Sequence, residues 1–155
     1  SMRNLAKVLS WAGKTEEAAR SAERALDLLG DDAESFFILS LDAGDSRRAI
    51  ALLREALRLD PDWVKPRLNL GVELARSGRH EAALVAYAEV ISRAPKHRSV
   101  HYNRGRVLVR MGRLDEAAAA FRTSLAIDPA DEAAREELAD IASARPLLAL
   151  GVDRK

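Results

Sequence analysis

The amino-acid sequence predicts an all-α fold, a right-handed solenoid built from antiparallel helix pairs. Three turn glycines, Gly44, Gly78 and Gly112, recur at an interval of 34 residues. The same interval separates three alanines and three prolines, which are Ala49, Ala83 and Ala117, then Pro61, Pro95 and Pro129. A period of this length is typical of stacked helix pairs, which bury their apolar faces only against their neighbours. Such an array leaves a long concave surface, so the period favours a binding scaffold over a catalytic pocket.

The composition agrees with a helical chain and excludes several function classes. Of the 155 residues, 48% are hydrophobic and only 5% are aromatic, and the abundant alanine and leucine are strong helix formers. The 25 basic and 24 acidic residues nearly cancel, so no overall charge attracts nucleic acid or an anionic membrane. The absence of cysteine excludes disulfides and thiolate metal sites. No apolar run approaches the roughly 20 residues of a membrane helix, and we expect a cytoplasmic protein.

The first repeat, residues 1–29, is expected to be a shortened pair of helices. Apolar residues follow helical spacing on both sides of a turn at Gly13. The alanine of its second helix, Ala18, precedes Ala49 by 31 residues instead of 34. This repeat therefore diverges from the others. Because Ser1 stands before a methionine, as in a cleavage scar or an internal cut, we also expect that a segment can precede the chain.

The second repeat, residues 30–63, keeps the pattern except at one position. It has the turn glycine Gly44 and the terminal Pro61, and apolar residues follow helical spacing on both sides of the turn. Phe37 stands where the two following repeats have a glycine. Because a bulky side chain at a close contact pushes the helices apart, we expect Phe37 to widen this pair.

The third and fourth repeats, residues 64–97 and 98–129, match each other without a gap. Each has a glycine in its first helix, Gly71 or Gly105, and a tight turn at a second glycine. Each second helix ends at a proline, which cannot continue a helix because it lacks the backbone N–H. Both repeats are therefore predicted to be regular helix pairs.

The end of the chain is predicted to contain a capping helix and a tail. Residues 130–144 have helical spacing, with Leu138 and Ile141 on the inner face and charged residues on the outer face. A terminal repeat needs such a polar outer face. Residues 145–155 contain a proline near their start and lack polar alternation, so they either fold back over the last helix or associate with another molecule. The candidate self-association residues are Leu147, Leu148 and Leu150.

These repeats resemble the tetratricopeptide repeat, in the small residues that let paired helices approach and in the proline that ends the second helix. The resemblance covers about four repeats and the capping helix, which together are predicted to form one domain. It implies that the first helix of each pair lines a concave groove, and that the groove binds extended peptides or helices of partner proteins. We therefore expect a non-enzymatic scaffold or adaptor. Two alternatives stay open: a self-assembly module that forms homo-oligomers, and the targeting domain of a larger enzyme.

Asparagines recur at one groove position of the array. Counted in register, Asn69 and Asn103 occupy equivalent positions, with Asn4 in the first repeat and Ser35 in the second. A carboxamide offers both a donor and an acceptor, so it can pair with a peptide unit whatever side chain the peptide carries. The resemblance implies this role in backbone capture. Alternatively, the asparagines bond to an adjacent helix or to water.

Arginines near these asparagines favour an acidic ligand. Arg76, Arg106 and Arg110 lie on the same predicted face, and the planar guanidinium binds carboxylates in pairs. Alternatively, these arginines face solvent or pair with nearby acids such as Glu73. The predicted peptide-binding residues are Lys65, Asn69, Arg76, Asn103, Arg106 and Arg110.

The sequence predicts no catalytic residue, cofactor or metal site. The glycines stand singly at helix turns, so no phosphate-binding loop is formed. His97 and His101 have the spacing of a metal-binding pair, but no further ligand completes a set. Trp11 and Trp63 lie near helix ends and are interpreted as packing residues at repeat junctions. The expected partner is a protein or peptide, acidic or extended, and neither nucleic acid nor a membrane interior.

Overall fold

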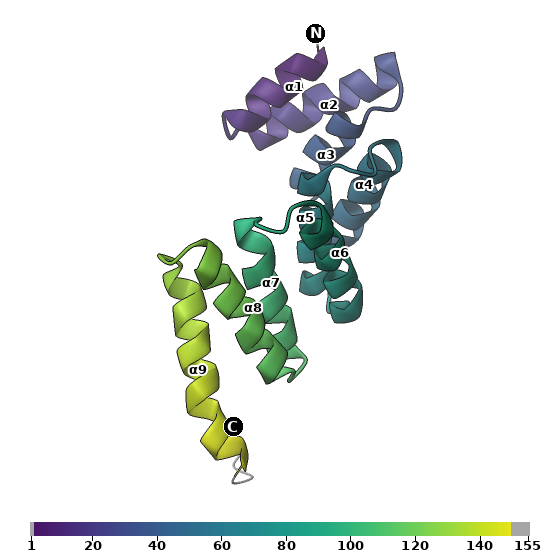
Figure 1. Ribbon diagram of the computed structural model, residues 1–155. Helices are drawn as coiled ribbons and strands as arrows, with labels where there is room; N and C mark the ends of the chain where they lie inside the picture. The colour runs from purple at the N-terminus through teal and green to yellow at the C-terminus, as the bar shows by residue number, and fades with distance from the viewer. Residues whose placement is uncertain (1, 150–155) are drawn as a thin grey trace. The chain divides into compact units, whose positions relative to one another are not determined.

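The computed structural model describes the backbone of residues 2–149 and the side chains of residues 2–144, and every regular element in this part is an α-helix (Figure 1). The described helices are α1 (Met2–Trp11), α2 (Thr15–Leu29), α3 (Ala33–Leu41), α4 (Ser46–Leu59), α5 (Val64–Arg76), α6 (His80–Arg93), α7 (Arg98–Arg110), α8 (Leu114–Ile127) and α9 (Glu132–Ala149). The prediction of an all-α solenoid of helix pairs is confirmed. No described helix combines the length and the apolar character that crossing a membrane requires.

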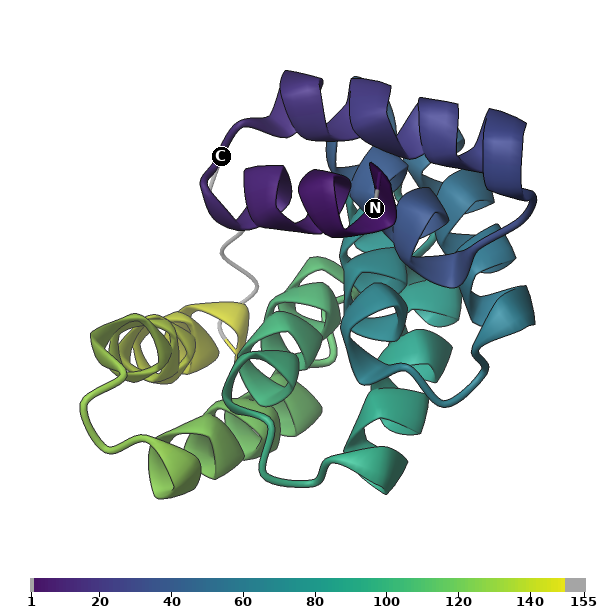
Figure 2. The ribbon, with the colours of Figure 1, turned by 90° about the horizontal axis from the view of Figure 1, so that it is seen from above.

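The chain divides into two compact units, residues 1–93 and residues 94–155. In the first unit, α1 packs on α2, α3 on α4 and α5 on α6, and neighbouring pairs contact one another through α2 with α3 and α4 with α5 (Figure 2). In the second unit, α8 packs between α7 and α9. Each unit therefore buries its own core, and the expectation of one continuous domain stays a prediction.

The turns inside the third and fourth repeats have the glycine termination that the period indicates. Gly78 and Gly112 adopt φ angles of 77° and 73°, in the left-handed region that residues with a Cβ rarely enter. The N–H that follows each glycine bonds back into the first helix, from Arg79 to the Leu74 carbonyl and from Arg113 to the Leu108 carbonyl, each at 2.9 Å. This bonding satisfies the last carbonyls of the helix, so a single glycine ends it.

Helix pairs differ in which of the two helices provides the large side chain. A Cβ added to Gly71 would lie 2.4 Å from the Tyr87 ring, and one added to Gly105 would lie 2.6 Å from the Phe121 ring. In the second repeat the sizes are exchanged, because Phe37 stands in the glycine position and packs with the smaller Leu53. Phe37 is buried. The expected widening of this pair stays a prediction, but the structure shows how its core accommodates Phe37.

One side chain at the start of α5, α7 and α9 is bonded to the proline that ends the preceding helix pair. In each case the side chain donates to the carbonyl of a proline six residues earlier, with a distance of 2.8 Å for His101 and 2.7 Å for Arg135. The three pairs are Arg67 with Pro61, His101 with Pro95, and Arg135 with Pro129. We call this contact the proline latch. It assigns His101, which is buried, a structural role.

The last helix, α9, begins and ends later than the sequence predicts. It begins after Asp131, whose Oδ1 accepts the Ala134 N–H at 3.1 Å while its Oδ2 accepts the Ser124 hydroxyl at 2.9 Å. Its inner face includes Ala134 and Ile141, which are both buried. The helix extends to Ala149 and includes Pro146 near its C-terminal end. The candidate self-association side chains of Leu147, Leu148 and Leu150 lie outside the described residues.

Candidate functional site

One hollow of the unit formed by residues 1–93 lies beside α3, α4 and α5. We call it the Glu73 hollow. It consists of two adjoining cavities of about 330 and 300 Å³, which share Ser40, Leu41, Glu73 and Arg76 in their linings. Asn69 and Val72 of α5 line the second of these cavities. The structure therefore brings the predicted residues Asn69 and Arg76 to one hollow.

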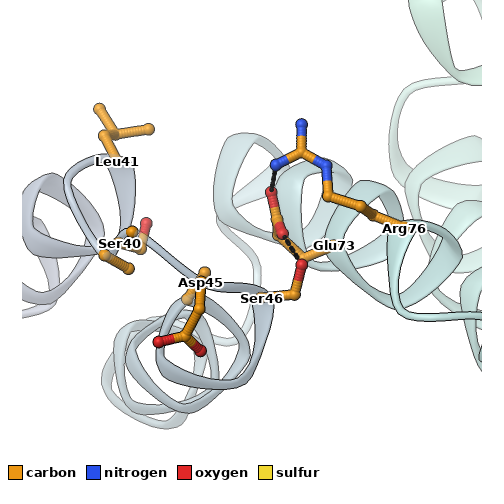
Figure 3. Close-up of a pocket in the computed structure, with 9 residues that line it drawn as sticks. Ser40, Leu41, Asp45, Ser46, Glu73 and Arg76 are labelled. Carbon is orange, nitrogen blue, oxygen red and sulfur yellow. Dashed lines mark hydrogen bonds and ion pairs between the residues drawn. The ribbon is translucent and has the colours of Figure 1, made fainter.

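Glu73 organises the polar contacts of this hollow, as Figure 3 shows. Its Oε2 accepts a hydrogen bond from the Ser46 hydroxyl at 2.6 Å, and its Oε1 lies 3.2 Å from Nη1 of Arg76. The Glu73 side chain is 17% exposed, whereas that of Arg76 is 70% exposed. A second anion can therefore reach Arg76, but it must compete with the Glu73 carboxylate. This is the pairing that the sequence left as an alternative.

The side-chain amides of Asn69 and Asn103 have no hydrogen-bond partner among the described residues. Both side chains are half-buried, and neither makes a hydrogen bond to another described residue. Asn103 lines a hollow of about 730 Å³ in the second unit, together with Arg98, Ser99 and Tyr102 of α7. Asp128 and Asp131 also line it, and Arg98 pairs with Asp128 at 3.2 Å. Each asparagine therefore stands at a hollow of its own unit with its donors and acceptor unused.

The series of asparagines is interrupted in the second repeat. Ser35, which occupies the equivalent position, is only 1% exposed. Its hydroxyl donates to Oδ2 of Asp32 at 2.7 Å, and its backbone N–H donates to the same oxygen at 2.9 Å. These bonds cap the N-terminus of α3. Ser35 therefore does not continue the series of available polar groups, because the helix cap engages and buries it.

The two remaining predicted arginines lie apart from the Asn103 hollow. Arg106 is half exposed, with its Nε 3.9 Å from Oε1 of Glu137 and its guanidinium 5.9 Å from the centre of the Tyr102 ring. Arg110 is exposed and forms no ion pair with any described residue. Neither side chain lines the hollow that contains Asn103. Their peptide-binding role stays a prediction.

A further hollow of the first unit contains both tryptophans, and we call it the tryptophan hollow. It measures about 210 Å³ and is lined by Lys7, Ser10, Trp11, Glu34, Phe37, Ile38, Trp63 and Lys65. Trp63 packs against Phe37 with a centroid distance of 5.0 Å. Lys65, one of the predicted groove residues, has its Nζ 5.2 Å from the centre of the Phe37 ring. These residues come from α1, α3 and the start of α5.

The sequence did not identify the tryptophan hollow as a site. The interpretation of Trp11 as a packing residue is wrong, because its side chain is 73% exposed. Trp63 does pack, and its partner Phe37 is the residue that departs from the glycine pattern. A signal was present in the sequence: a large aromatic replaces glycine in the same repeat that ends at Trp63, and Trp11 ends the first helix. The repeat interval could not show that Trp11, Phe37 and Trp63 lie around one hollow.

Comparisons with known proteins identify the repeats. Residues 36–95, 68–132 and 102–150 match one family model described as tetratricopeptide repeat, and residues 1–32 match another. An FK506-binding protein-like protein of Mus musculus is 34% identical over 93 residues, which cover 57% of this chain and 27% of that protein. The chain thus spans about a quarter of that relative's length.

Solved structures share the fold. A MamA structure from Desulfovibrio magneticus RS-1 has a TM-score of 0.84 at 20% identity, and the match covers 94% of this chain and 84% of that chain. YrrB, a tetratricopeptide repeat protein described as having an unusual peptide-binding site, has a TM-score of 0.76 at 22% identity, with 84% of this chain and 69% of that chain covered. At such identities the similarity establishes the common fold.

Proposed function

The chain belongs to the tetratricopeptide repeat family, and on that basis we propose that it is a non-enzymatic scaffold that binds an extended, acidic segment of a partner protein. The observation that carries this proposal is the state of Asn69 and Asn103. Both amides lie at hollows on first helices, half-buried and without a hydrogen bond to another described residue. Because neither amide bonds to another described residue, the donors and the acceptor of each are available to a ligand.

The amides determine the form of the ligand. A carboxamide can donate to a peptide carbonyl and accept from a peptide N–H at once. Each asparagine therefore suits the backbone of an extended segment, which presents both kinds of group along its length. In this proposal Asn69 acts for the first unit and Asn103 for the second. The similarity to YrrB agrees with peptide binding by this fold.

The charges determine the composition of the ligand. Lys65 of the first unit and Arg110 of the second are exposed and form no ion pair with any described residue. Arg76 and Arg106 each have an acidic neighbour, but both remain at least half exposed. An acidic segment would neutralise these cations, whereas a basic segment would be repelled. Since exposed ion pairs are screened by salt, binding should weaken as ionic strength rises.

Co-purification followed by mass spectrometry identifies the partner, and the paired variant Asn69→Ala with Asn103→Ala tests the site. We expect the variant to lose partner binding by about tenfold or more, because two hydrogen bonds at about 0.5–1.5 kcal/mol each are removed. Its melting temperature should stay within about 2 °C of the parent protein, since both amides lack bonds within the described fold. Ser92→Ala, on the exposed part of α6, is the control. Unchanged partner binding by the paired variant would contradict the proposal.

A further inference from the structure

The floor of the tryptophan hollow is buried and apolar. Phe37 and Ile38 of α3 are 5% and 4% exposed, and Trp63 is tilted against Phe37 at 54°. The volume of about 210 Å³ exceeds the roughly 150 Å³ that is enough for a benzene ring in an enclosed apolar cavity. The hollow can therefore accept one aromatic or long aliphatic side chain, which would stack on rings that are already held in place.

Trp11 forms an open wall of this hollow. Its ring is 73% exposed, and its contact with the protein includes the ammonium group of Lys7, 5.3 Å from the ring centre. Leaving a large ring in water forgoes the favourable free energy of burying it. Tryptophan is also among the residues that most often dominate the binding energy of an interface. A side chain that enters the hollow would cover part of this ring.

The two lysines at the rim differ in whether an acidic residue of the protein already pairs with them. Lys7 lies 3.0 Å from Oε1 of Glu34, so its charge is already paired. Lys65 is exposed and forms no ion pair with any described residue, and its Nζ lies above the Phe37 ring. The hollow thus has an apolar floor and one unneutralised cation at its edge. This combination is complementary to an apolar side chain that stands next to a carboxylate.

We propose that the tryptophan hollow binds an aromatic or long aliphatic side chain of a partner peptide, and that Lys65 binds the acidic side chain next to it. This inference rests on the proposed peptide binding. It specifies the two neighbouring residues of the partner peptide that the first unit recognises. The carboxylate is that of an internal side chain in a peptide that runs from Lys65 toward Asn69, which lies one turn further along α5.

The test uses the chain's own fluorescence, since both of its tryptophans line the hollow. The probe is the capped peptide acetyl-Ala-Ser-Phe-Glu-Ala-Ser-amide, titrated into the full chain up to millimolar concentration. We expect a saturable change in tryptophan emission. Replacing the peptide's Phe with Ala should weaken binding by about tenfold or more, because one aromatic ring is no longer buried. Replacing its Glu with Gln should weaken binding by about two- to fivefold, as is typical of an exposed ion pair.

Variants of the protein assign these effects to the hollow. Lys65→Gln should abolish the difference between the Glu and Gln peptides, whereas Lys96→Gln, at an exposed lysine of the other unit, should preserve it. Trp11→Ala should weaken binding of the Phe peptide while Trp63 still reports occupancy, and it should leave the fold intact because Trp11 is 73% exposed. The proposal is overturned by the absence of a saturable change, by equal binding of the Glu and Gln peptides, or by an unaltered preference in Lys65→Gln.

Two further comparisons separate the outcomes. A peptide that ends in a free carboxylate after Phe, acetyl-Ala-Ser-Ala-Phe, should bind more weakly than the capped probe; stronger binding would overturn the internal position of the acid. The partner identified by co-purification distinguishes this inference from the proposed function. If Lys65→Gln and Trp11→Ala both retain the partner while the paired asparagine variant loses it, the scaffold function stands and the tryptophan hollow is not its specificity site.

Discussion

At the scale of single residues, the two helices of a pair fit together at one position where a large residue faces a smaller one. Gly71 faces the ring of Tyr87 and Gly105 faces the ring of Phe121, with no room for a Cβ in either position. Phe37 with Leu53 is the reversed arrangement. Because protein interiors are close-packed, the two members of each pair constrain each other. A glycine in the first helix therefore depends on the ring in the second.

Gly71→Ala should destabilise the protein despite the better helix propensity of alanine. The propensity gain is about 1 kcal/mol, but the added methyl group overlaps a ring that is 1% exposed, and overpacking of this kind costs about 1–3 kcal/mol. We expect a net loss of about 1 kcal/mol in the free energy of unfolding, measured with urea. Tyr87→Leu in the same chain should relieve the overlap, so the two changes together should cost less than the sum of the single changes. Strict additivity would disprove the steric coupling.

Glu73 is a second residue whose effect depends on a neighbour, because it holds Arg76 at the Glu73 hollow. Glu73→Gln removes the charge but keeps an acceptor for the Ser46 hydroxyl. We expect the acidic partner segment to bind about two- to fivefold more tightly, since Arg76 no longer has a competing anion. Isothermal titration at low and high salt measures this gain, which salt should reduce. Glu55→Gln, in the comparable pair with Arg58 on α4, should leave affinity unchanged; an equal gain there would refute the assignment.

At the scale of helices, the proline latch joins the first turn of a helix to the segment that precedes that helix. A donor on α5, α7 and α9 bonds the carbonyl of the proline six residues earlier. The proline ends the helix because its own N–H is missing, and the latch gives its carbonyl a partner in the next helix. The proline-containing segment is thereby bonded to the helix that follows it.

His101→Arg should preserve stability, whereas His101→Leu should reduce it. Arginine serves as the donor in two of the three latches, so it can replace His101. Leucine keeps apolar bulk but leaves the Pro95 carbonyl without this donor, which should lower the free energy of unfolding by about 1 kcal/mol. Urea unfolding followed by circular dichroism measures both variants. Equal losses for arginine and leucine would show that shape, rather than the hydrogen bond, matters at this position.

At the scale of the whole molecule, two units with separate cores share one chain. The first contains one cluster that includes Ala6, Ala22 and Ile38 and another that joins Phe37 and Leu53. In repeat proteins each element contacts only its neighbours, so stability adds locally. Residues 1–93 should therefore fold without the remainder and melt cooperatively when followed by circular dichroism. A coil-like spectrum of this fragment at low temperature would contradict the separate core.

Self-association through the end of the chain stays a prediction of the sequence. A chain truncated after residue 144 lacks Leu147, Leu148 and Leu150. If these side chains join molecules, the full chain should sediment faster as its concentration rises, and the truncated chain should not. A monomer at every concentration for both chains would exclude this alternative to the scaffold. A concentration dependence that survives truncation would place the contact elsewhere.

The helix pairs, their turns and the family could be predicted from the amino-acid sequence alone. Glycine and proline act through their own backbone, so the positions of Gly78, Gly112 and Pro95 predict where helices end. Apolar spacing likewise predicts which face of each helix is buried. Aligning the repeats position by position also identified Asn69 and Asn103. In the structure each of them lines a hollow, and its amide makes no hydrogen bond to another described residue.

Which of these surface residues are available to a ligand becomes visible in the folded structure. The cap at Asp32 engages Ser35, Glu73 engages Arg76, and Trp11 stands in water instead of packing. The repeat interval left these outcomes open: Glu73 was one of two alternatives for Arg76, and the packing of side chains in space decides which alternative is realised. The tryptophan hollow arises in the same way: Phe37 shapes it only because Leu53 is small enough to let the ring pack where the other repeats have glycine.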